Sequence, residues 1–161
     1  MARPAVIAID QGTTNTKALL VGLDGAVIAT ASAPTQTHYP KAGWAEQAAQ
    51  GIWASAVQVL GEIAATPDTD ILAIGISNQR ESALLWDVES GAPVGPCVIW
   101  QCRRSAELCA GLRDAGHEGA IRAKSGLGLD PLFSAGKWRW LFEHVPQARA
   151  ARTGSAACRN G

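Results

Sequence analysis

Short apolar runs separated by polar turns open the chain, in a pattern typical of an antiparallel meander. The first run ends at Asp10, and the polar residues 11–16 separate it from the second run. Asp24-Gly25 follows the second run and favours a type I′ hairpin turn, because both central positions of that turn need positive φ. The pattern predicts three consecutive antiparallel strands, at residues 6–9, 18–21 and 26–31.

A helical period follows a loop over residues 34–44, which has no regular period and contains two prolines. Apolar residues recur at steps of three and four from Ala49 to Ile63, and Pro67 ends the pattern. One apolar face of this kind predicts an amphipathic helix that packs on a sheet.

The remainder of the chain changes from strands to helices at about Ser105. A continuous apolar run over residues 71–77 predicts a buried strand, and shorter runs predict strands at 83–86 and 97–100. Helical periods then cover residues 106–115, 117–124 and 135–144. This order of elements predicts an α/β fold in which helices pack on a mixed sheet.

Composition and charge narrow the class of protein. The 161 residues are 47% hydrophobic and 17% charged, which is typical of one globular domain over residues 1–161. The 14 basic and 14 acidic residues cancel, so nothing in the charge suggests binding to nucleic acid or to an anionic membrane. Residues 1–10 have the features of neither a signal peptide nor a membrane span, and we expect a cytoplasmic protein.

The cysteines show neither the C-x-x-C spacing of redox motifs nor the pattern of a zinc site. Nothing suggests secretion either, which would favour disulfides. We therefore expect four free thiols, at Cys97, Cys102, Cys109 and Cys158.

The first polar turn contains residue types that can hold phosphate. Gly12 lets the backbone approach an anion closely, and Thr13 and Thr14 add hydroxyl donors. Asp10 can hold Mg²⁺ directly or through water, while Lys17 offers a cation to a phosphate oxygen. The chain has neither a Walker loop nor a dinucleotide-binding glycine motif, so a nucleotide site here would use the hairpin. The same residues also suit a plain hairpin turn, in which Asp10 accepts turn N–H groups.

A second polar cluster, residues 78–81, follows the apolar run over 71–77, at the end of the strand where sheets usually place their sites. Arg80 supplies a fork of donors and Glu81 two acceptor oxygens, which suits a polyol because each hydroxyl both donates and accepts. Neighbouring residues of a strand point oppositely, so both can reach one ligand only if the backbone turns. A partly buried, ion-paired cluster that closes the sheet is the structural alternative.

Trp100 lies at the end of another predicted strand. Its ring could cover the apolar carbon edge of a small substrate, or it could belong to the core. Arg103 and Arg104 could begin the helix that follows.

Five segments of the chain form a recognisable set. They are DQGTT (10–14), YPKAGWAE (39–46), IGISNQRE (74–81), IWQCRR (99–104) and GLDP (128–131). Together they resemble the amino-terminal part of the FGGY carbohydrate kinases, and the glycerol-phosphorylating members most closely. The resemblance implies an actin-like, ribonuclease-H-like ATPase domain, here incomplete, and covers about residues 5–149. Residues 150–161 depart from it, and we expect a truncated or frameshifted reading frame there.

The resemblance implies roles for the first polar turn. Thr13 and Thr14 would contact the phosphates of ATP, with Gly12 in the same turn. Asp10 would serve the Mg²⁺ site. Lys17 stands where many members have Arg, and it keeps the charge but not the forked geometry.

The resemblance also implies a small polyol as substrate, bound by Arg80 and Glu81 in a pocket that Trp100 lines. Members that phosphorylate glycerol typically have a Tyr, whose hydroxyl touches the substrate, where this chain has Leu132. Leu132 cannot donate that hydrogen bond, so another polyol or a ketose such as xylulose stays open beside glycerol.

Other parts of the implied enzyme lie outside the chain. The general base of the family is an Asp beyond residue 161, and a second domain closes over ATP and substrate. We therefore expect part of an ATP-dependent carbohydrate kinase, inactive as an isolated chain. A non-catalytic remnant that still binds phosphate and a structural domain without ligand are the alternatives, and a homo-oligomer stays open.

Overall fold

The computed structural model describes residues 1–150 and 153–157, which form two compact units. The first unit combines residues 1–37 with 48–79, and the second combines 38–47 with 80–157. Each unit therefore draws on two separate stretches of the sequence.

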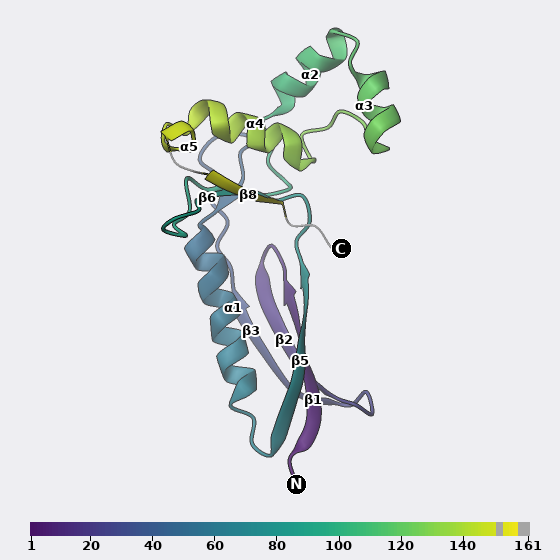
Figure 1. Cartoon of the computed structure of the whole chain (residues 1–161), viewed down its shortest axis with the longest axis vertical. Coiled ribbons are helices and arrows are strands. Elements are labelled where there is room, and N and C mark those ends of the chain that lie inside the picture. The colour runs from purple at the N-terminus through teal and green to yellow at the C-terminus, as the bar shows by residue number, and fades with distance from the viewer. Residues whose placement is uncertain (151–152, 158–161) are drawn as a thin grey trace. The chain divides into compact units, whose positions relative to one another are not determined.

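The first unit contains a mixed four-stranded sheet in the order β3-β2-β1-β5. Its strands are β1 (Arg3–Gln11), β2 (Asn15–Gly22), β3 (Val27–Pro34) and β5 (Thr69–Asn78). β1, β2 and β3 pair as an antiparallel meander, and β5 runs parallel to β1 (Figure 1). The three opening strands and the mixed sheet are confirmed, and each strand is longer than its apolar run.

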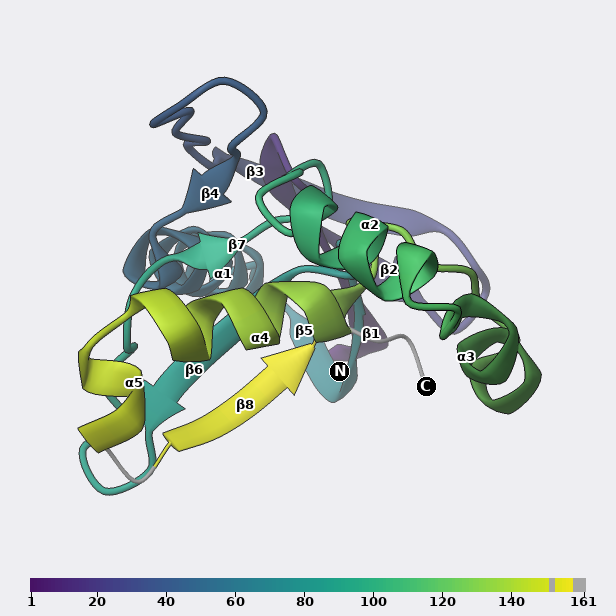
Figure 2. The ribbon, with the colours of Figure 1, turned by 90° about the horizontal axis from the view of Figure 1, so that it is seen from above.

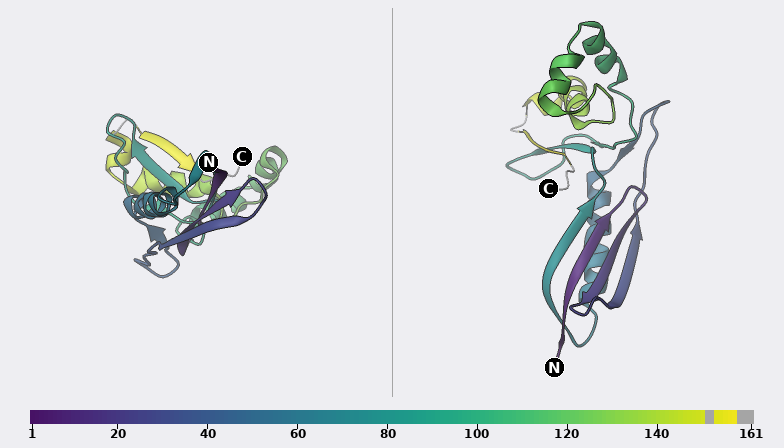
Figure 3. Two further views of the ribbon diagram at one scale, coloured as in Figure 1. Left: turned by 90° about the horizontal axis from the view of Figure 1, so that it is seen from below. Right: turned by 90° about the vertical axis from the view of Figure 1, so that its right-hand side faces the viewer.

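One helix, α1 (Ala49–Ala64), covers one face of this sheet (Figure 3, right). Alternate residues of β1 and β2 point toward the helix, as the two-residue period of a strand requires. The buried core consists of Ala5, Ile7, Ile9, Ala18, Leu20, Ala33, Val59 and Ile63. The same period turns Asp10 and Lys17 toward the opposite face, where both side chains are exposed.

β5 is an exposed strand, and the prediction of a buried strand over residues 71–77 is wrong. Ile74 and Ile76 lie beside Ile7 and Ile9 in the parallel register of β5 and β1, yet they are 49% and 71% exposed. The reason is the position of β5 at the edge of the sheet: α1 packs mainly against β1, β2 and β3.

The second unit contains a small sheet in the order β4-β7-β6-β8, with antiparallel neighbours throughout. Its strands are β4 (Glu46–Gln47), β6 (Ala83–Asp87), β7 (Cys97–Val98) and β8 (Thr153–Ala157). Its helices are α2 (Ala106–Asp114), α3 (Glu118–Ser125), α4 (Ser134–His144) and α5 (Gln147–Ala150). α4 lies against β6 (Figure 2).

Most of the second unit agrees with the sequence patterns. α2, α3, α4 and β6 begin and end within about one residue of the predicted elements. β7 ends two residues earlier than predicted, and neither β4, α5 nor β8 was predicted. β8 contains only small residues and threonine, so its strand conformation comes from pairing with β6 and not from an apolar pattern.

Cys97, Cys102 and Cys109 are free and buried, while the prediction for Cys158 lies outside the described residues. Each helix in residues 1–150 is too short or too polar to cross a bilayer.

Candidate functional site

The residues predicted to bind phosphate lie together at the hairpin between β1 and β2, in the first unit. Asp10 and Lys17 are directly opposite in the antiparallel ladder, so their side chains project from the same face of the sheet. Both are exposed, because the core side chains of Ile9 and Ala18 occupy the other face. A carboxylate and an ammonium group are therefore neighbours at one end of the sheet.

Gly12 is required by the hairpin itself. Its N–H donates to the Asn15 carbonyl oxygen at 3.0 Å. A Cβ atom at Gly12 would lie 2.9 Å from that same oxygen, closer than real Cβ contacts allow. The hairpin alone therefore excludes a side chain at Gly12, whether or not a phosphate approaches the turn.

A buried glutamine, Gln79, braces the turn from the end of β5. Its backbone N–H donates to the Gln11 carbonyl oxygen at 2.8 Å, and its side-chain oxygen accepts from the Thr13 hydroxyl at 3.2 Å. On the other side, the Thr35 hydroxyl donates to the Thr13 carbonyl oxygen at 2.7 Å. Thr13 is thus held within the protein, whereas the neighbouring Thr14 is exposed.

The bracing role of Gln79 could not be read from the sequence. Gln79 stood among the polar residues 78–81, but 66 positions separate it from Thr13. Only the parallel pairing of β1 with β5 brings the carboxyl ends of these two strands together.

Arg80 and Glu81 lie at a turn of the second unit, directly before β6. Glu81 has a φ of 60°, in the left-handed region, so the backbone turn that the polyol hypothesis requires is present. Arg80 is exposed and, among the described residues, forms no ion pair. The structural alternative, an ion-paired cluster, is therefore absent at Arg80 and Glu81 in the described residues.

Trp100 leaves the second sheet at the same end as Glu81. The antiparallel pairing of Ala83 with Val98 puts the start of β6 beside the end of β7. Glu81 lies two residues before Ala83 and Trp100 two residues after Val98, so both lie just outside the strands at this end. Trp100 is 39% exposed, so it is not fully enclosed in the core of the second unit.

Helix α4 contacts Glu81 through its first residue. Both the N–H and the hydroxyl of Ser134 donate to the same carboxylate oxygen of Glu81, at 3.2 Å and 3.0 Å. One turn later, the completely buried Lys137 donates to the carbonyl oxygens of Pro131, at 2.9 Å, and Leu132. Burial lowers the pKa of Lys137 to about 8, an effect that the nearby Glu81 charge opposes. Neither Ser134 nor Lys137 was singled out in the sequence, because their contacts become visible only when α4 is packed against the turn at Glu81.

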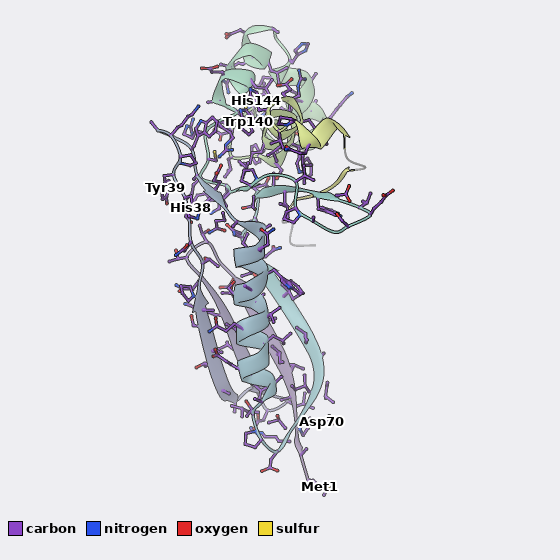
Figure 4. All side chains as sticks on the ribbon, turned by 90° about the vertical axis from the view of Figure 1, so that its left-hand side faces the viewer. Met1, His38, Tyr39, Asp70, Trp140 and His144 are labelled. Carbon is purple, nitrogen blue, oxygen red and sulfur yellow. The ribbon has the colours of Figure 1, made fainter. Side chains whose placement is uncertain are left out.

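Arg104 forms the buried ion pair of the second unit and does not begin a helix. Its guanidinium donates to a carboxylate oxygen of Glu46 at 2.6 Å, and only 1% of its side chain is exposed. The same guanidinium lies 4.2 Å from the ring centre of Trp44 and 4.6 Å from that of Trp140. His144 stacks on the ring of Trp140, one turn along α4 (Figure 4). The cluster joins the loop before β4, the segment before α2 and helix α4.

Comparison with known proteins agrees with this architecture. The family model for the N-terminal domain of the FGGY carbohydrate kinases matches residues 5–154. A glycerol kinase of Ectopseudomonas mendocina is 46% identical over 147 residues, which cover 89% of this chain and 30% of that relative. This chain therefore spans about a third of the proteins that it matches.

Solved structures of such kinases have the same fold. A glycerol kinase of Plasmodium falciparum, solved with ADP, gives a TM-score of 0.90 at 24% identity, over 96% of this chain and 32% of that one. A xylulose kinase of Rhodospirillum rubrum gives 0.83 at 33% identity, over 91% and 31%. The predicted fold class is confirmed: an incomplete actin-like α/β domain with a mixed sheet and helices.

Proposed function

Since the chain belongs to the FGGY family of carbohydrate kinases, we propose that it binds phosphate and polyol in an enzyme that transfers the γ-phosphoryl group of ATP to a hydroxyl group. Glycerol is the first candidate substrate, because the E. mendocina relative named a glycerol kinase is 46% identical. The observation that carries the proposal is the hairpin, on which Asp10 and Lys17 share one exposed face beside a turn that Gln79 braces.

The hairpin would hold the phosphate tail of ATP. The Lys17 ammonium would pair with a phosphate oxygen, and the exposed Thr14 hydroxyl would donate to another. Thr13 already donates its hydroxyl to Gln79, so its contribution would be mainly to keep the turn in shape. Gly12 would act in the same way, because its lack of a side chain permits the close hairpin.

Asp10 fits the Mg²⁺ that such a transfer needs. Mg²⁺ prefers oxygen ligands and is usually bound by one or two carboxylates together with substrate phosphates and water. Asp10 could supply such a carboxylate, because its side chain is exposed on the same face of the sheet as Lys17. When bound, Mg²⁺ would neutralise charge on the phosphates.

The polyol would bind at the second unit. Its hydroxyl groups would accept from the exposed Arg80 guanidinium and donate to the Glu81 carboxylate, while the Trp100 ring would cover its carbon edge. Leu132, which is 37% exposed, adds an apolar surface where a hydroxyl donor is absent. The hydrogen bond expected for glycerol at this position is therefore missing, and a ketose such as xylulose is the second candidate, because the R. rubrum xylulose kinase is 33% identical.

By the family resemblance, the general base would come from the part of the enzyme that this chain does not span. The isolated chain would then bind ligands without turnover. ATP as phosphoryl donor and three free thiols support a cytoplasmic location.

A chimera tests the proposal. Residues 1–149 would be joined to the remaining part of the E. mendocina glycerol kinase, and ADP formation measured with glycerol, with D-xylulose and without acceptor. We expect turnover with one of the two acceptors, and a loss of at least about tenfold in kcat/KM for Arg80→Ala and Glu81→Gln. Arg122→Ala, at an exposed arginine of α3, is the control. A folded chimera that binds Mg-ADP but phosphorylates neither acceptor would contradict the proposed substrates.

A further inference from the structure

The first turn of α4 contacts Glu81 and the loop before the helix at the same time. Ser134 is the first residue of α4, so its N–H has no acceptor within the helix. The Glu81 carboxylate takes that place and also accepts the Ser134 hydroxyl. A carboxylate at a helix N-terminus is favoured by the helix dipole as well.

These bonds fix a residue whose backbone is strained. Among the described residues, only Asp68 and Glu81 are non-glycine residues with positive φ. Such a conformation persists only where surrounding contacts determine it, and it is common at binding sites. For Glu81, both side-chain hydrogen bonds come from Ser134, which is 5% exposed.

Lys137 ties the same turn to the loop before it. It lies three residues after Ser134, so both face the same side of the helix. Its ammonium group is completely buried and donates to the carbonyl oxygens of Pro131 and Leu132. A buried cation is costly unless it is hydrogen-bonded and balanced by nearby negative charge. Here the carbonyl oxygens provide the bonds, and Glu81 provides charge close enough to raise the pKa of Lys137 against the effect of burial.

We infer that Ser134 and Lys137 are positioning residues, which hold the Glu81 carboxylate and the Leu132 backbone in one arrangement that receives the polyol. Neither is a catalytic residue, because both are almost fully buried and cannot contact a ligand. The inference rests on the proposed polyol-binding role of Glu81. It predicts that changes at α4 lower polyol affinity selectively, whereas a purely structural role would lower only stability.

Glycerol titration of the 161-residue chain, followed by ¹H–¹⁵N NMR, provides the first test. We expect Ser134→Ala to weaken glycerol binding about tenfold, since a bond to a charged group is lost, and Ser134→Thr to restore it to within about twofold. Ser125→Ala is the matched control, because Ser125 is exposed on α3 and its hydroxyl donates to the Ile121 carbonyl oxygen. A folded Ser134→Ala chain that binds glycerol as tightly as the parent would overturn the inference.

The pH dependence of glycerol binding separates positioning from packing. The charged and titratable groups that act on Lys137 are Glu81, Asp130, Cys102 and Cys109. As pH rises from about 7 to 9.5, Lys137 loses the charge that attracts Glu81, so glycerol affinity should fall several-fold. Lys137→Arg stays charged and should keep its affinity over this range. Equal pH profiles for the two chains would count against the inference.

A second measurement does not depend on polyol binding. If the parent chain binds no glycerol, the proposed substrate fails, and the polyol part of the inference fails with it; hydrogen exchange at the Ser134 amide then tests the contact that holds Glu81. We expect this amide to exchange at least about tenfold faster in Glu81→Ala and Lys137→Met, because its acceptor is removed or released. The Leu141 amide, in the same helix, should be unchanged. Equal Ser134 exchange in the parent and both variants would overturn the inference.

Discussion

Asp10 and Lys17 lie directly opposite each other in the antiparallel ladder of β1 and β2, and both project from the face of the sheet that α1 leaves open. The ladder holds a carboxylate and an ammonium group as neighbours beside a turn that Gln79 braces. This arrangement allows one side chain to serve Mg²⁺ while the other meets a phosphate oxygen.

Lys17→Met should weaken binding of Mg-ADP to the chain about tenfold, because one charge-assisted contact is lost. Lys17→Arg should stay within about threefold of the parent, since the charge is kept. Isothermal titration calorimetry measures both. Lys124→Met is the control, because Lys124 is an exposed lysine of α3 outside the hairpin. An equal loss in Lys124→Met would mean that only general charge attraction is involved.

Gly12→Ala should lower the free energy of unfolding by about 1–3 kcal/mol, because the new Cβ would lie 2.9 Å from the Asn15 carbonyl oxygen. Gly61→Ala is the matched control in the same unit. Gly61 lies inside α1 and a Cβ there meets nothing within 4 Å, so the helix should gain about 0.5–1 kcal/mol. Urea denaturation measures both variants, and a Gly12→Ala chain as stable as the parent would disprove the close contact.

Arg104→Met should destabilise the chain by about 3–5 kcal/mol, because it leaves Glu46 without its buried partner. Arg104→Lys should fall between this variant and the parent, since lysine keeps the charge but loses the planar group between Trp44 and Trp140. Arg139→Met removes an exposed ion pair with Glu143 on α4 and should cost less than about 1 kcal/mol. Denaturation followed by tryptophan fluorescence compares the three, and similar costs for Arg104→Met and Arg139→Met would refute the buried cluster.

The free energy of unfolding should rise with pH above about 8 because of Lys137. In the folded chain this group loses its proton at about 8, whereas the ordinary value in the unfolded chain is 10.5. Between these values the unfolded state binds more protons, so raising the pH favours the folded state, by up to about 3 kcal/mol in total. Over the same window glycerol affinity should fall, so stability and binding should change in opposite directions.

The Lys137→Met chain has no ammonium group at this position, so it is the reference for how the free energy of unfolding changes with pH. Burial raises the pKa of the Cys109 thiol, which makes stability fall as the pH passes its ordinary value of 9.0, and the Lys137 charge lowers that same pKa. Both chains should therefore also carry Cys109→Ala, and the difference between them, from urea denaturation at several pH values, then isolates Lys137. A difference that stays constant from pH 7 to 10, to within about 0.5 kcal/mol, would contradict the lowered pKa.

Local patterns were sufficient for most elements of this fold. The Asp24-Gly25 turn and the runs around it predicted three antiparallel strands, and apolar steps of three and four predicted α1, α2, α3 and α4. Two of the three missed elements are short: β4 has two residues and α5 has four, which is too few to show a period. The third, β8, has no apolar pattern. The burial of β5 was misjudged because an apolar run does not reveal whether a strand is central or at an edge.

The candidate site was also predicted only in part. Residue types alone marked Asp10, Lys17, Arg80 and Glu81, and the resemblance assigned them to phosphate and polyol. The residues that hold the site in place could not be predicted, because they are far from their partners in the sequence. For example, 53 positions separate Glu81 from Ser134, and 58 separate Glu46 from Arg104.

The sequence by itself determined the order of the elements, the hairpin and the polar groups that a kinase would need, since these follow from local periodicity, turn chemistry and side-chain type. Only the tertiary structure decided which face each group occupies and what holds it there. Strand register put Asp10 opposite Lys17, parallel pairing brought Gln79 to Thr13, and the first turn of α4 gave Glu81 its two donors. Such contacts depend on how distant segments pack, and local sequence does not contain that information.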